Sequence, residues 1–207
     1  MCASYGLGGG EGMELPAGLP QLDDREDYTR LAAWVSEYDG QARIAGRRAL
    51  NYNPVILQRD SRLRLDLGWW SLWIAGRLRK EYSTFNARDD KLMTSPWWRA
   101  PFASTRALLP ATWYVEKGKR FELAGEPFTI AALYNVADID GVARITYTMV
   151  TRAAVAEAST VHPRMPLVVP ESMRESWLDQ QQAGDAGLLS ATIASSEAPS
   201  AAMAIAG

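Results

Sequence analysis

Short runs of apolar, β-branched and aromatic residues, separated by turn sequences, constrain the fold of this chain more than any other feature. They lie at Val55–Gln58, Leu63–Leu67, Ala107–Glu116, Phe128–Tyr134 and Ile145–Thr151. Runs of this composition and length are typical of β-strands. Two of the connections, Lys117-Gly118-Lys119 and Asp138–Gly141, have the composition of hairpin turns. The pattern therefore predicts a domain built on antiparallel strands.

Helical patterns lie on both sides of this strand-rich region. A helix is expected to start after Asp23 or Asp24, either of which can cap it, and to run to about Tyr38. Two shorter helices are expected at Ala153–Thr160 and Pro170–Gln182. Together with the strands, these helices predict an α+β fold.

The length and composition of the chain fit one globular domain. Its 207 residues are 47% hydrophobic and 22% charged, which are ordinary values for a folded protein. Residues 6–20 are rich in Gly and Pro and are expected to form a loop. The Ala/Ser-rich residues 183–207 are expected to form a loosely attached tail. We therefore expect one domain at residues 1–182, followed by that tail.

Several classes of protein are excluded by what the sequence lacks. No apolar run approaches the roughly 18 residues that a membrane span requires, and the first residues do not have the pattern of a secretory signal. A single cysteine permits neither an intramolecular disulfide nor a Cys-based zinc site, and a single histidine leaves a histidine-rich metal site without ligands. We expect a soluble, cytoplasmic monomer without metal, cofactor or membrane association.

Charge is distributed unevenly along the chain. Residues 11–40 carry eight acidic and two basic side chains, whereas residues 41–80 carry nine basic and two acidic ones. Six tryptophans follow in and after this basic segment, at positions 69, 70, 73, 97, 98 and 113. Arginine interleaved with aromatic residues is typical of single-stranded nucleic-acid binding, because phosphates need cations and unpaired bases need flat partners. The same composition also fits a solvated arginine face over a tryptophan-rich core.

Cys2 has the most distinctive potential chemistry in the chain. An initiator methionine is generally removed when the next residue is small, and removal of Met1 would leave a free α-amine beside the Cys2 thiol. These groups ordinarily have pKa values of about 8 and about 8.5, so both are usable near neutral pH. The amine can condense with an aldehyde to an imine, and the thiol can then close on the imine carbon to give a thiazolidine. A cysteine at position 2 also occurs by chance, without any such function.

Asn86, Glu116 and His162 are polar residues that could serve such a reaction. Glu116 ends an apolar run, where a carboxylate would be partly desolvated, and His162 begins the segment His162-Pro163-Arg164-Met165-Pro166, whose prolines fix a rigid turn. Each residue also has a structural alternative. Asn86 fits a capping residue, Glu116 fits a hairpin-end charge beside a lysine, and His162 fits a packed loop residue.

Taken together, these motifs resemble the SRAP family of SOS-response-associated peptidases, or abasic-site processing proteins. The resemblance is carried, in family order over roughly residues 1–180, by Met1-Cys2, Asn51-Tyr52-Asn53-Pro54, Gly68–Trp73, Asn86-Ala87-Arg88, Pro110–Glu116 and His162-Pro163-Arg164-Met165-Pro166. It implies a compact α+β domain with a mainly antiparallel, barrel-like core, flanking helices and a basic cleft for single-stranded DNA. It also implies capture of the abasic-site aldehyde as a thiazolidine DNA–protein crosslink.

The resemblance assigns catalytic roles to four residues. Cys2 would be the nucleophile and the point of attachment, and Asn86 would hold the N-terminal amine or the sugar oxygen by hydrogen bonds. Glu116 would be the general acid and base beside the amine. His162 would promote opening of the sugar ring and the reverse reaction.

The resemblance also implies a DNA-binding set. Arg88 and Arg164 would grip the phosphates beside the lesion, Thr151 would lie near the site, and Trp73 would stack or wedge next to it. Ser4 belongs to this set by position, because relatives carry an arginine where this chain has serine. The expected partner is single-stranded DNA with abasic sites, and the protein would be nucleoid-associated when bound.

Three functions remain open from the sequence. The first is an enzyme that processes abasic sites by forming the crosslink, and the same residues could also support hydrolase or lyase chemistry. The second is an N-terminal-nucleophile cysteine peptidase or amidohydrolase with autoprocessing activity. The third is a non-catalytic nucleic-acid-binding module.

Overall fold

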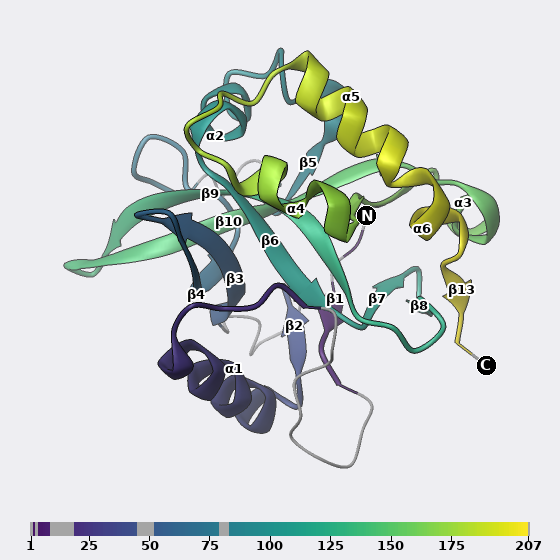
Figure 1. The fold of residues 1–207 in the computed structure, drawn as a ribbon, viewed down its shortest axis with the longest axis horizontal. Coiled ribbons are helices and arrows are strands. Elements are labelled where there is room, and N and C mark those ends of the chain that lie inside the picture. The colour runs from purple at the N-terminus through teal and green to yellow at the C-terminus, as the bar shows by residue number, and fades with distance from the viewer. Residues whose placement is uncertain (1, 3, 9–18, 45–51, 79–82, 207) are drawn as a thin grey trace.

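Five strands close into a barrel at the centre of the computed structural model, which describes residues 2, 4–8, 19–44, 52–78 and 83–206 (Figure 1). These strands are β3 (Tyr52–Arg59), β4 (Arg62–Trp70), β6 (Arg106–Ala111), β9 (Phe128–Ile139) and β10 (Val142–Ala153). Around the barrel each strand pairs with the next in the order β10-β4-β3-β6-β9, and β9 pairs with β10 to close it. Only the β4–β10 pair within this ring is parallel. The expected α+β fold with a mainly antiparallel, barrel-like core is confirmed.

A second, smaller sheet lies beside the barrel and holds the first described strand. Its order is β13 (Ala204–Ile205), β8 (Lys119–Glu122), β7 (Trp113–Glu116), β1 (Ser4–Gly6) and β2 (Gln41–Arg43). Three further strands extend the barrel sheet, namely β5 (Asn86–Arg88), β11 (Arg164–Pro166) and β12 (Val168–Val169). Because β1 lies between β7 and β2, Cys2 is held beside the end of β7.

The expectation of a single strand at Ala107–Glu116 is wrong, because this segment forms two strands, one in each sheet. The division falls at Thr112, where β6 leaves the barrel and β7 begins. The backbone N–H of Thr112 donates to the Gly6 carbonyl at 2.7 Å, and its hydroxyl accepts from the Gly8 N–H at 3.0 Å. These bonds satisfy the backbone where the chain changes partner strands.

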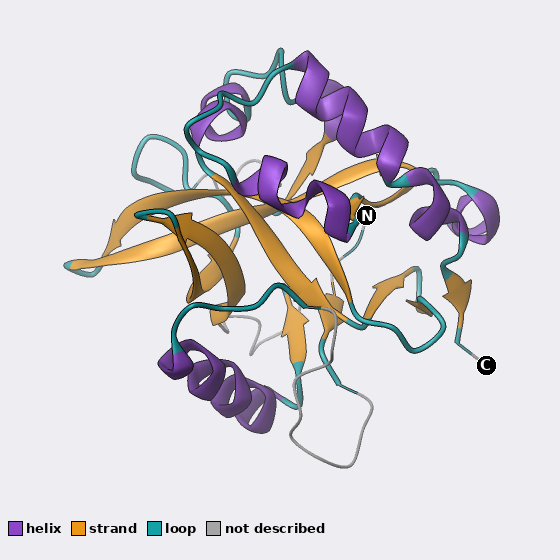
Figure 2. Ribbon diagram, in the orientation of Figure 1, coloured by secondary structure: helices purple, strands orange, loops and turns teal. Residues whose placement is uncertain are grey.

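Helices surround the strands, with α4 and α5 on one side of the barrel and α1 on the other (Figure 2). They are α1 (Arg25–Tyr38), α2 (Arg99–Ser104), α3 (Ala156–Val161), α4 (Glu171–Leu178), α5 (Ala186–Ser195) and α6 (Glu197–Ala201), with a short 3-10 helix at Asp89–Lys91. The expected cap of the first helix is confirmed, because Asp24 accepts from the backbone N–H of Glu26 at 2.9 Å. None of the described helices is long and apolar enough to cross a membrane.

Gly40 allows the end of α1 to pass close to the start of the chain. Its φ of +59° lies in the left-handed region that favours glycine. A Cβ atom at this position would lie 1.7 Å from the Leu7 carbonyl oxygen, which no arrangement of side chains could relieve. The Leu7 N–H donates to the Gly40 carbonyl at 2.9 Å, so glycine here keeps β1 and β2 in register.

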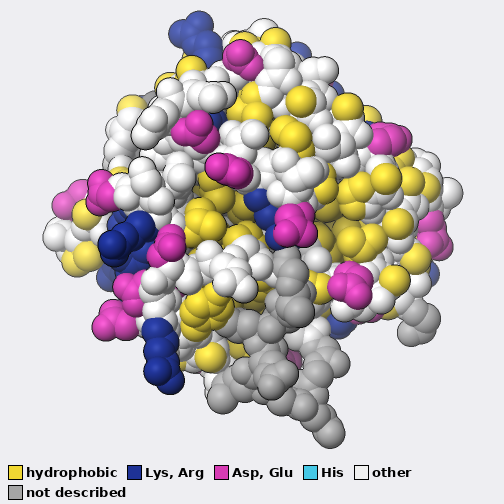
Figure 3. Space-filling view, in the orientation of Figure 1, with side chains coloured by type: hydrophobic (Ala, Val, Ile, Leu, Met, Phe, Trp, Pro, Cys, Tyr) yellow, Lys and Arg dark blue, Asp and Glu magenta, His cyan; other side chains and the backbone are white. Residues whose placement is uncertain are grey.

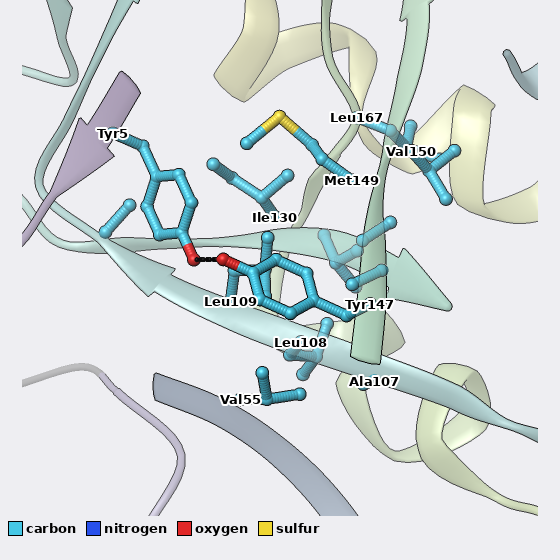
Figure 4. Packing of buried hydrophobic residues seen from close by; sticks show 14 of the residues in the cluster. Tyr5, Val55, Ala107, Leu108, Leu109, Ile130, Tyr147, Met149, Val150 and Leu167 are labelled. Carbon is cyan, nitrogen blue, oxygen red and sulfur yellow. Dashed lines mark hydrogen bonds between the residues drawn. The ribbon is translucent and has the colours of Figure 1, made fainter. Parts of the chain in front are cut away.

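The barrel interior is largely apolar, and a pair of tyrosines lies within it, with the fully buried Asn53 beside Tyr147. The hydroxyls of Tyr5 and Tyr147 lie 2.7 Å apart among Val55, Leu109 and Ile130 (Figure 4). Burial raises the pKa of both phenols above the ordinary value, so both stay protonated at neutral pH. The polar pair connects β1, the strand next to Cys2, with β10 of the barrel wall.

The acidic and basic segments of the sequence neutralise each other where α1 packs on β4. The fully buried carboxylate of Asp27 accepts from Arg30 at 2.9 Å, from Arg64 at 2.8 Å and from the Leu65 N–H at 2.9 Å. Asp66, within the basic segment itself, pairs with Arg59 at 3.1 Å. Part of the basic segment therefore serves to hold α1 on the barrel rather than to form a free cationic surface.

We expect Asp27→Asn to lower the free energy of unfolding by about 2 kcal/mol at neutral pH, because charge-assisted hydrogen bonds are lost. Burial tends to raise the pKa of Asp27, but the bonds from Arg64 and Leu65 outweigh it and hold the pKa below its usual value. A carboxylate whose pKa is lowered in the folded state stabilises the fold at pH values above its unfolded pKa of about 3.9. This stabilisation is lost as the pH falls through the folded-state pKa.

Urea unfolding at neutral pH and at progressively lower pH, below about 4, measures this effect. The difference between Asp27→Asn and the parent should shrink on acidification. Glu175→Gln, which changes an exposed carboxylate on α4, is the matched control. A difference that does not depend on pH would contradict the assignment to the ionised carboxylate.

The segment after residue 182 differs from the expected loose tail. α5 and α6 pack on the barrel, where buried Arg152 donates to the Ile193 carbonyl at 3.1 Å and also pairs with Glu197. The Ile205 N–H donates to Glu157 of α3 at 3.1 Å. Small Ala and Ser side chains favour or tolerate helix here and allow close packing, although their sequence has no marked amphipathic pattern.

Candidate active site

Cys2 lies just before β1 and is buried, with 1% of its surface exposed. Its thiol donates to the Ser4 carbonyl at 3.2 Å, and its own carbonyl accepts from Asn86 Nδ2 at 2.7 Å. Burial raises the pKa of the Cys2 thiol to about 12, and the negative charge of Glu116 adds to this increase. The thiol is therefore protonated at neutral pH and needs a nearby positive charge or a base before it can act as a nucleophile.

Asn86 reaches Cys2 from β5, which pairs in parallel with β10 so that Asn86 lies opposite Met149. The side chain is 6% exposed, and its Oδ1 atom is buried without a hydrogen-bond partner in the described part of the chain. A buried amide oxygen without a partner costs about 1–3 kcal/mol, so it calls for an explanation. The amide fixes the backbone of Cys2 with its nitrogen and leaves its oxygen able to accept a further bond beside that residue.

Glu116 is the last residue of β7 and is 4% exposed. The next two residues, Lys117 and Gly118, both have positive φ, at +50° and +75°, and connect β7 to β8 by the expected tight hairpin. The carboxylate therefore lies at the end of the strand that pairs with β1, and its Oε2 atom is 4.0 Å from Nδ1 of His162. A carboxylate and an imidazole at this spacing can both exchange protons with a group bound beside them.

His162 follows α3 in an extended conformation and is oriented by its own backbone neighbours. Its Nδ1 atom lies 3.1 Å from both the backbone N–H and the carbonyl oxygen of Arg164. The side chain is 17% exposed, which is more than Glu116. The histidine thus sits at the outer side of the carboxylate, in a turn whose geometry the prolines restrict.

Arg164 is tied into the fold and does not project freely toward solvent. It donates to Asp89 Oδ1 at 2.5 Å and to the Thr151 carbonyl, and its side chain is 13% exposed. The Thr151 hydroxyl in turn donates to the Ala87 carbonyl at 3.3 Å. This network joins β10, β5 and β11, so Arg164 and Thr151 hold in place the segments that carry Asn86 and His162.

The remaining residues of the predicted DNA-binding set are Arg88, Ser4 and Trp73, and of these Ser4 contacts Cys2 through its backbone. Arg88 is exposed and forms a two-bond ion pair with Asp90, at 2.9 and 2.8 Å. Ser4 contributes the carbonyl that accepts from the Cys2 thiol. The backbone of Trp73 bonds to Thr146 and Asn135 on the β9–β10 hairpin.

Three tyrosines near Cys2, namely Tyr5, Tyr114 and Tyr147, were not predicted from the sequence. Tyr5 lies opposite Tyr114 across the β1–β7 pair, and Tyr147 meets Tyr5 inside the barrel. The hydroxyl of Tyr114 is buried without a hydrogen-bond partner in the described residues. Burial, with the charges of Cys2 and Glu116, raises the pKa of Tyr114. The alternation of β7, which puts Tyr114 and Glu116 on one face, is the signal that could have identified it.

Comparison with known proteins gives one family. The family model for SOS response associated peptidase (SRAP) matches residues 49–205. No curated protein matches the chain in sequence. The matched region contains Asn86, Glu116 and His162, whereas Cys2 lies before it.

Three of the solved structures with a similar fold come from two bacteria. A protein from Bordetella bronchiseptica has 22% sequence identity and a TM-score of 0.56, over 86% of this chain and 88% of its own. A phage-related protein from the same organism has 18% identity and a TM-score of 0.57, over 98% and 92%. A protein from Bacteroides thetaiotaomicron has 20% identity and a TM-score of 0.53, over 68% and 67%. Identities this low establish the shared fold alone.

Proposed function

Because this chain belongs to the SOS response associated peptidase family, whose name links it to the response to DNA damage, we propose that it captures abasic sites in single-stranded DNA through Cys2. One observation carries the proposal. Cys2, Asn86, Glu116 and His162 are distant in sequence, yet hydrogen bonding, charge interaction and a 4.0 Å contact join them in one cluster, in which the first three residues are buried. A packed core does not require a thiol, an amide, a carboxylate and an imidazole at one place.

The proposed reaction begins after loss of Met1, which frees the α-amine of Cys2. The amine adds to the aldehyde carbon of the opened sugar, and water leaves to give an imine. The thiol then adds to the imine carbon, and its proton passes to the nitrogen, which closes a thiazolidine. Because burial raises the pKa of the thiol to about 12, whereas an α-amine ordinarily titrates near 8, the amine is the group that attacks first.

The neighbours of Cys2 support this order of steps. The Oδ1 of Asn86, which has no hydrogen-bond partner among the described residues, can accept from the α-amine and hold the amine lone pair toward the aldehyde. Glu116 can take a proton from the attacking amine and return it to the departing water. His162, at the outer side of the site, can protonate the ring oxygen of the closed sugar, since imidazole exchanges protons readily near neutral pH.

Arg88 is proposed to contact a phosphate, and we expect Arg88→Ala to weaken non-covalent binding of single-stranded DNA. Its guanidinium is exposed and can exchange Asp90 for a phosphate. The slope of log affinity against log salt should become shallower by about 0.7, the value for one phosphate on a single strand. Fluorescence anisotropy at several salt concentrations measures the slope.

Arg25→Ala, which removes an exposed arginine from α1, is the matched control for the change in net charge. Asp90→Asn should have the opposite effect to Arg88→Ala, because it releases the guanidinium for the phosphate. An unchanged slope in Arg88→Ala would remove this residue from the phosphate contacts.

The function is tested with three matched single-stranded oligonucleotides, one carrying an abasic site, one intact, and one carrying a reduced abasic site that has no aldehyde. We expect a heat-stable protein–DNA adduct with the first alone. Mass spectrometry of the purified protein must show in parallel that its N-terminal residue is Cys2. A protein with a free N-terminal cysteine that forms no such adduct would overturn the proposal.

A second candidate function comes from the family description, which names a peptidase. A cysteine with an adjacent carboxylate and imidazole can attack an amide carbonyl instead of an aldehyde. Cleavage of peptides without any DNA adduct would favour this function. Salt-sensitive binding of DNA, with neither adduct nor cleavage, would favour a non-catalytic binding module.

A further inference from the structure

Tyr114 carries a buried hydroxyl that the reaction proposed above does not use. On the face of the molecule shown in Figure 3, acidic and basic side chains lie at the surface, where water can satisfy them. The Tyr114 hydroxyl lies inside and has no hydrogen-bond partner among the described residues, and the side chain is 1% exposed. A buried donor without a partner destabilises a fold, whereas phenylalanine would fill the same space without that donor. The hydroxyl therefore calls for a role other than packing.

The surrounding strands fix the position of the Tyr114 ring. Tyr114 precedes Glu116 by two residues on β7, so the two side chains lie on the same face of that strand. On one side, the ring of Tyr114 stacks on Phe121 of β8, with centroids 4.9 Å apart and planes at 9°. On the other side, Tyr114 lies opposite Tyr5 across the β1–β7 pair. The phenol is thus held rigidly beside the strand that follows Cys2.

The Cys2 thiol lies against the same part of β7. It bonds to a backbone group of Val115, the residue between Tyr114 and Glu116. In agreement with this position, the negative charges of Cys2 and Glu116 add to the effect of burial and raise the pKa of Tyr114. The neighbouring phenol of Tyr5 is already engaged, because its hydroxyl bonds to that of Tyr147 at 2.7 Å (Figure 4).

The site needs a hydrogen-bond donor that its other residues do not supply. When an amine adds to an aldehyde, negative charge develops on the aldehyde oxygen, and a positioned donor stabilises that charge. The Nδ2 of Asn86 already donates to the Cys2 carbonyl. The carboxylate of Glu116 can only accept. Since its raised pKa keeps Tyr114 protonated at neutral pH, its hydroxyl can donate.

We infer that the Tyr114 hydroxyl is a catalytic hydrogen-bond donor to the aldehyde oxygen when the α-amine of Cys2 adds to the aldehyde. The inference rests on the proposed function for the identity of the reaction. The bond from nitrogen to the aldehyde carbon forms, the carbonyl π bond breaks, and its electron pair moves to the oxygen, where Tyr114 donates. Glu116 then carries both amine protons to this oxygen, which leaves as water when the imine forms. The phenol keeps its own proton throughout.

Tyr114→Phe removes the hydroxyl alone and tests this role. Single-turnover crosslinking should become about 10²-fold slower, the effect of losing one such donor, with abasic DNA and with a simple open-chain aldehyde alike. Reversible binding of an intact oligonucleotide should not change, because the hydroxyl acts on the aldehyde. In a Cys2→Ser background, borohydride trapping of the imine should slow by the same factor, since the amine adds before the thiol acts.

The controls separate this role from an effect on folding. Tyr134→Phe removes another buried phenol hydroxyl, one that accepts from Gln180 at 3.0 Å, and should react at the parent rate. Tyr114→Phe should unfold at a urea concentration no lower than the parent, because its hydroxyl bonds to no described residue. In urea-unfolded protein, the parent and Tyr114→Phe should capture the open-chain aldehyde at equal rates, because the phenol is no longer held beside Cys2.

The outcomes distinguish this inference from the proposed function. A folded Tyr114→Phe protein that reacts at the parent rate, or that traps the imine as fast as its Cys2→Ser parent, overturns the inference. A lower urea midpoint in Tyr114→Phe also overturns it, because the hydroxyl would then have a structural partner. If the folded parent captures the open-chain aldehyde but not abasic DNA, the proposed function fails and the open-chain rates decide the role of Tyr114. If the folded parent captures neither, both fail.

Discussion

Cys2→Ala is expected to abolish the heat-stable adduct with abasic DNA completely and to leave reversible binding of single-stranded DNA near the parent level. The substitution removes the thiol that closes the ring, while Ala keeps the β-carbon and the backbone bond from Asn86 to the carbonyl of residue 2. The thiol bonds to backbone groups of Ser4 and Val115, and these two residues also pair across β1 and β7, so we expect the fold to survive loss of the thiol. Denaturing gel electrophoresis after heating measures the adduct, and anisotropy measures the binding.

Cys2→Ser and a blocked amine separate the two reacting groups. Cys2→Ser keeps the amine and should give an imine that borohydride can trap but that heat reverses, because a hydroxyl closes a less stable ring. A variant with a persistent N-terminal tag keeps the thiol but has no free α-amine, and it should form no adduct at all. A heat-stable adduct with Cys2→Ala, or crosslinking at the parent rate by the tagged protein, would show that the aminothiol is not the reacting group.

Glu116→Gln and His162→Ala are each expected to slow crosslinking by about 10²–10⁴-fold, the usual contribution of a positioned general acid or base. The two variants should differ in how the loss depends on the substrate. An abasic sugar exists mostly as a closed ring, so a proton must reach the ring oxygen before the aldehyde is available. His162 is assigned to that step and should be needed for closed-ring abasic DNA more than for a simple open-chain aldehyde. Glu116 acts on the amine and the departing water, so its variant should slow both substrates.

Single-turnover rates on the two substrates decide between these roles. Equal losses on both substrates in His162→Ala would show that this histidine does not act at ring opening. Reversal of a preformed crosslink should also slow in His162→Ala, since reversal passes through the same protonation. Because Glu116 and His162 lie 4.0 Å apart, the double variant should lose less than the product of the two single losses if the pair works as a unit.

The long strands were predictable because their signal is local. In β3, β9 and β10, β-branched and aromatic residues recur over four or more positions, and the hairpins at Lys117-Gly118 and Asp140-Gly141 carry the glycine that a left-handed turn favours. The three-residue strands β1 and β5 have no such pattern. They exist because each finds a distant partner, β1 on β7 and β5 on β10, and such pairing is invisible in three residues of sequence.

The candidate site was proposed from the sequence as a set of residues, whereas its geometry could not be predicted. Sequence and family resemblance named Cys2, Asn86, Glu116 and His162, whereas the bond from Asn86 to the Cys2 carbonyl depends on two strand pairings between remote segments. Arg164 illustrates the limit of residue type as a guide. An arginine in a proline-rich turn looks like a phosphate ligand, but here most of its side chain is buried against Asp89 and Thr151.

The position of β1 in the middle of its sheet sets the order in which the site can form during synthesis. β1 pairs with β2 at Gln41–Arg43 and with β7, which begins more than a hundred positions after β1, at Trp113. Until β7 has been translated, Cys2 lacks the neighbouring strand that carries Glu116. Under the proposed function, Met1 has to be removed before this pairing forms, because Cys2 is buried in the folded chain.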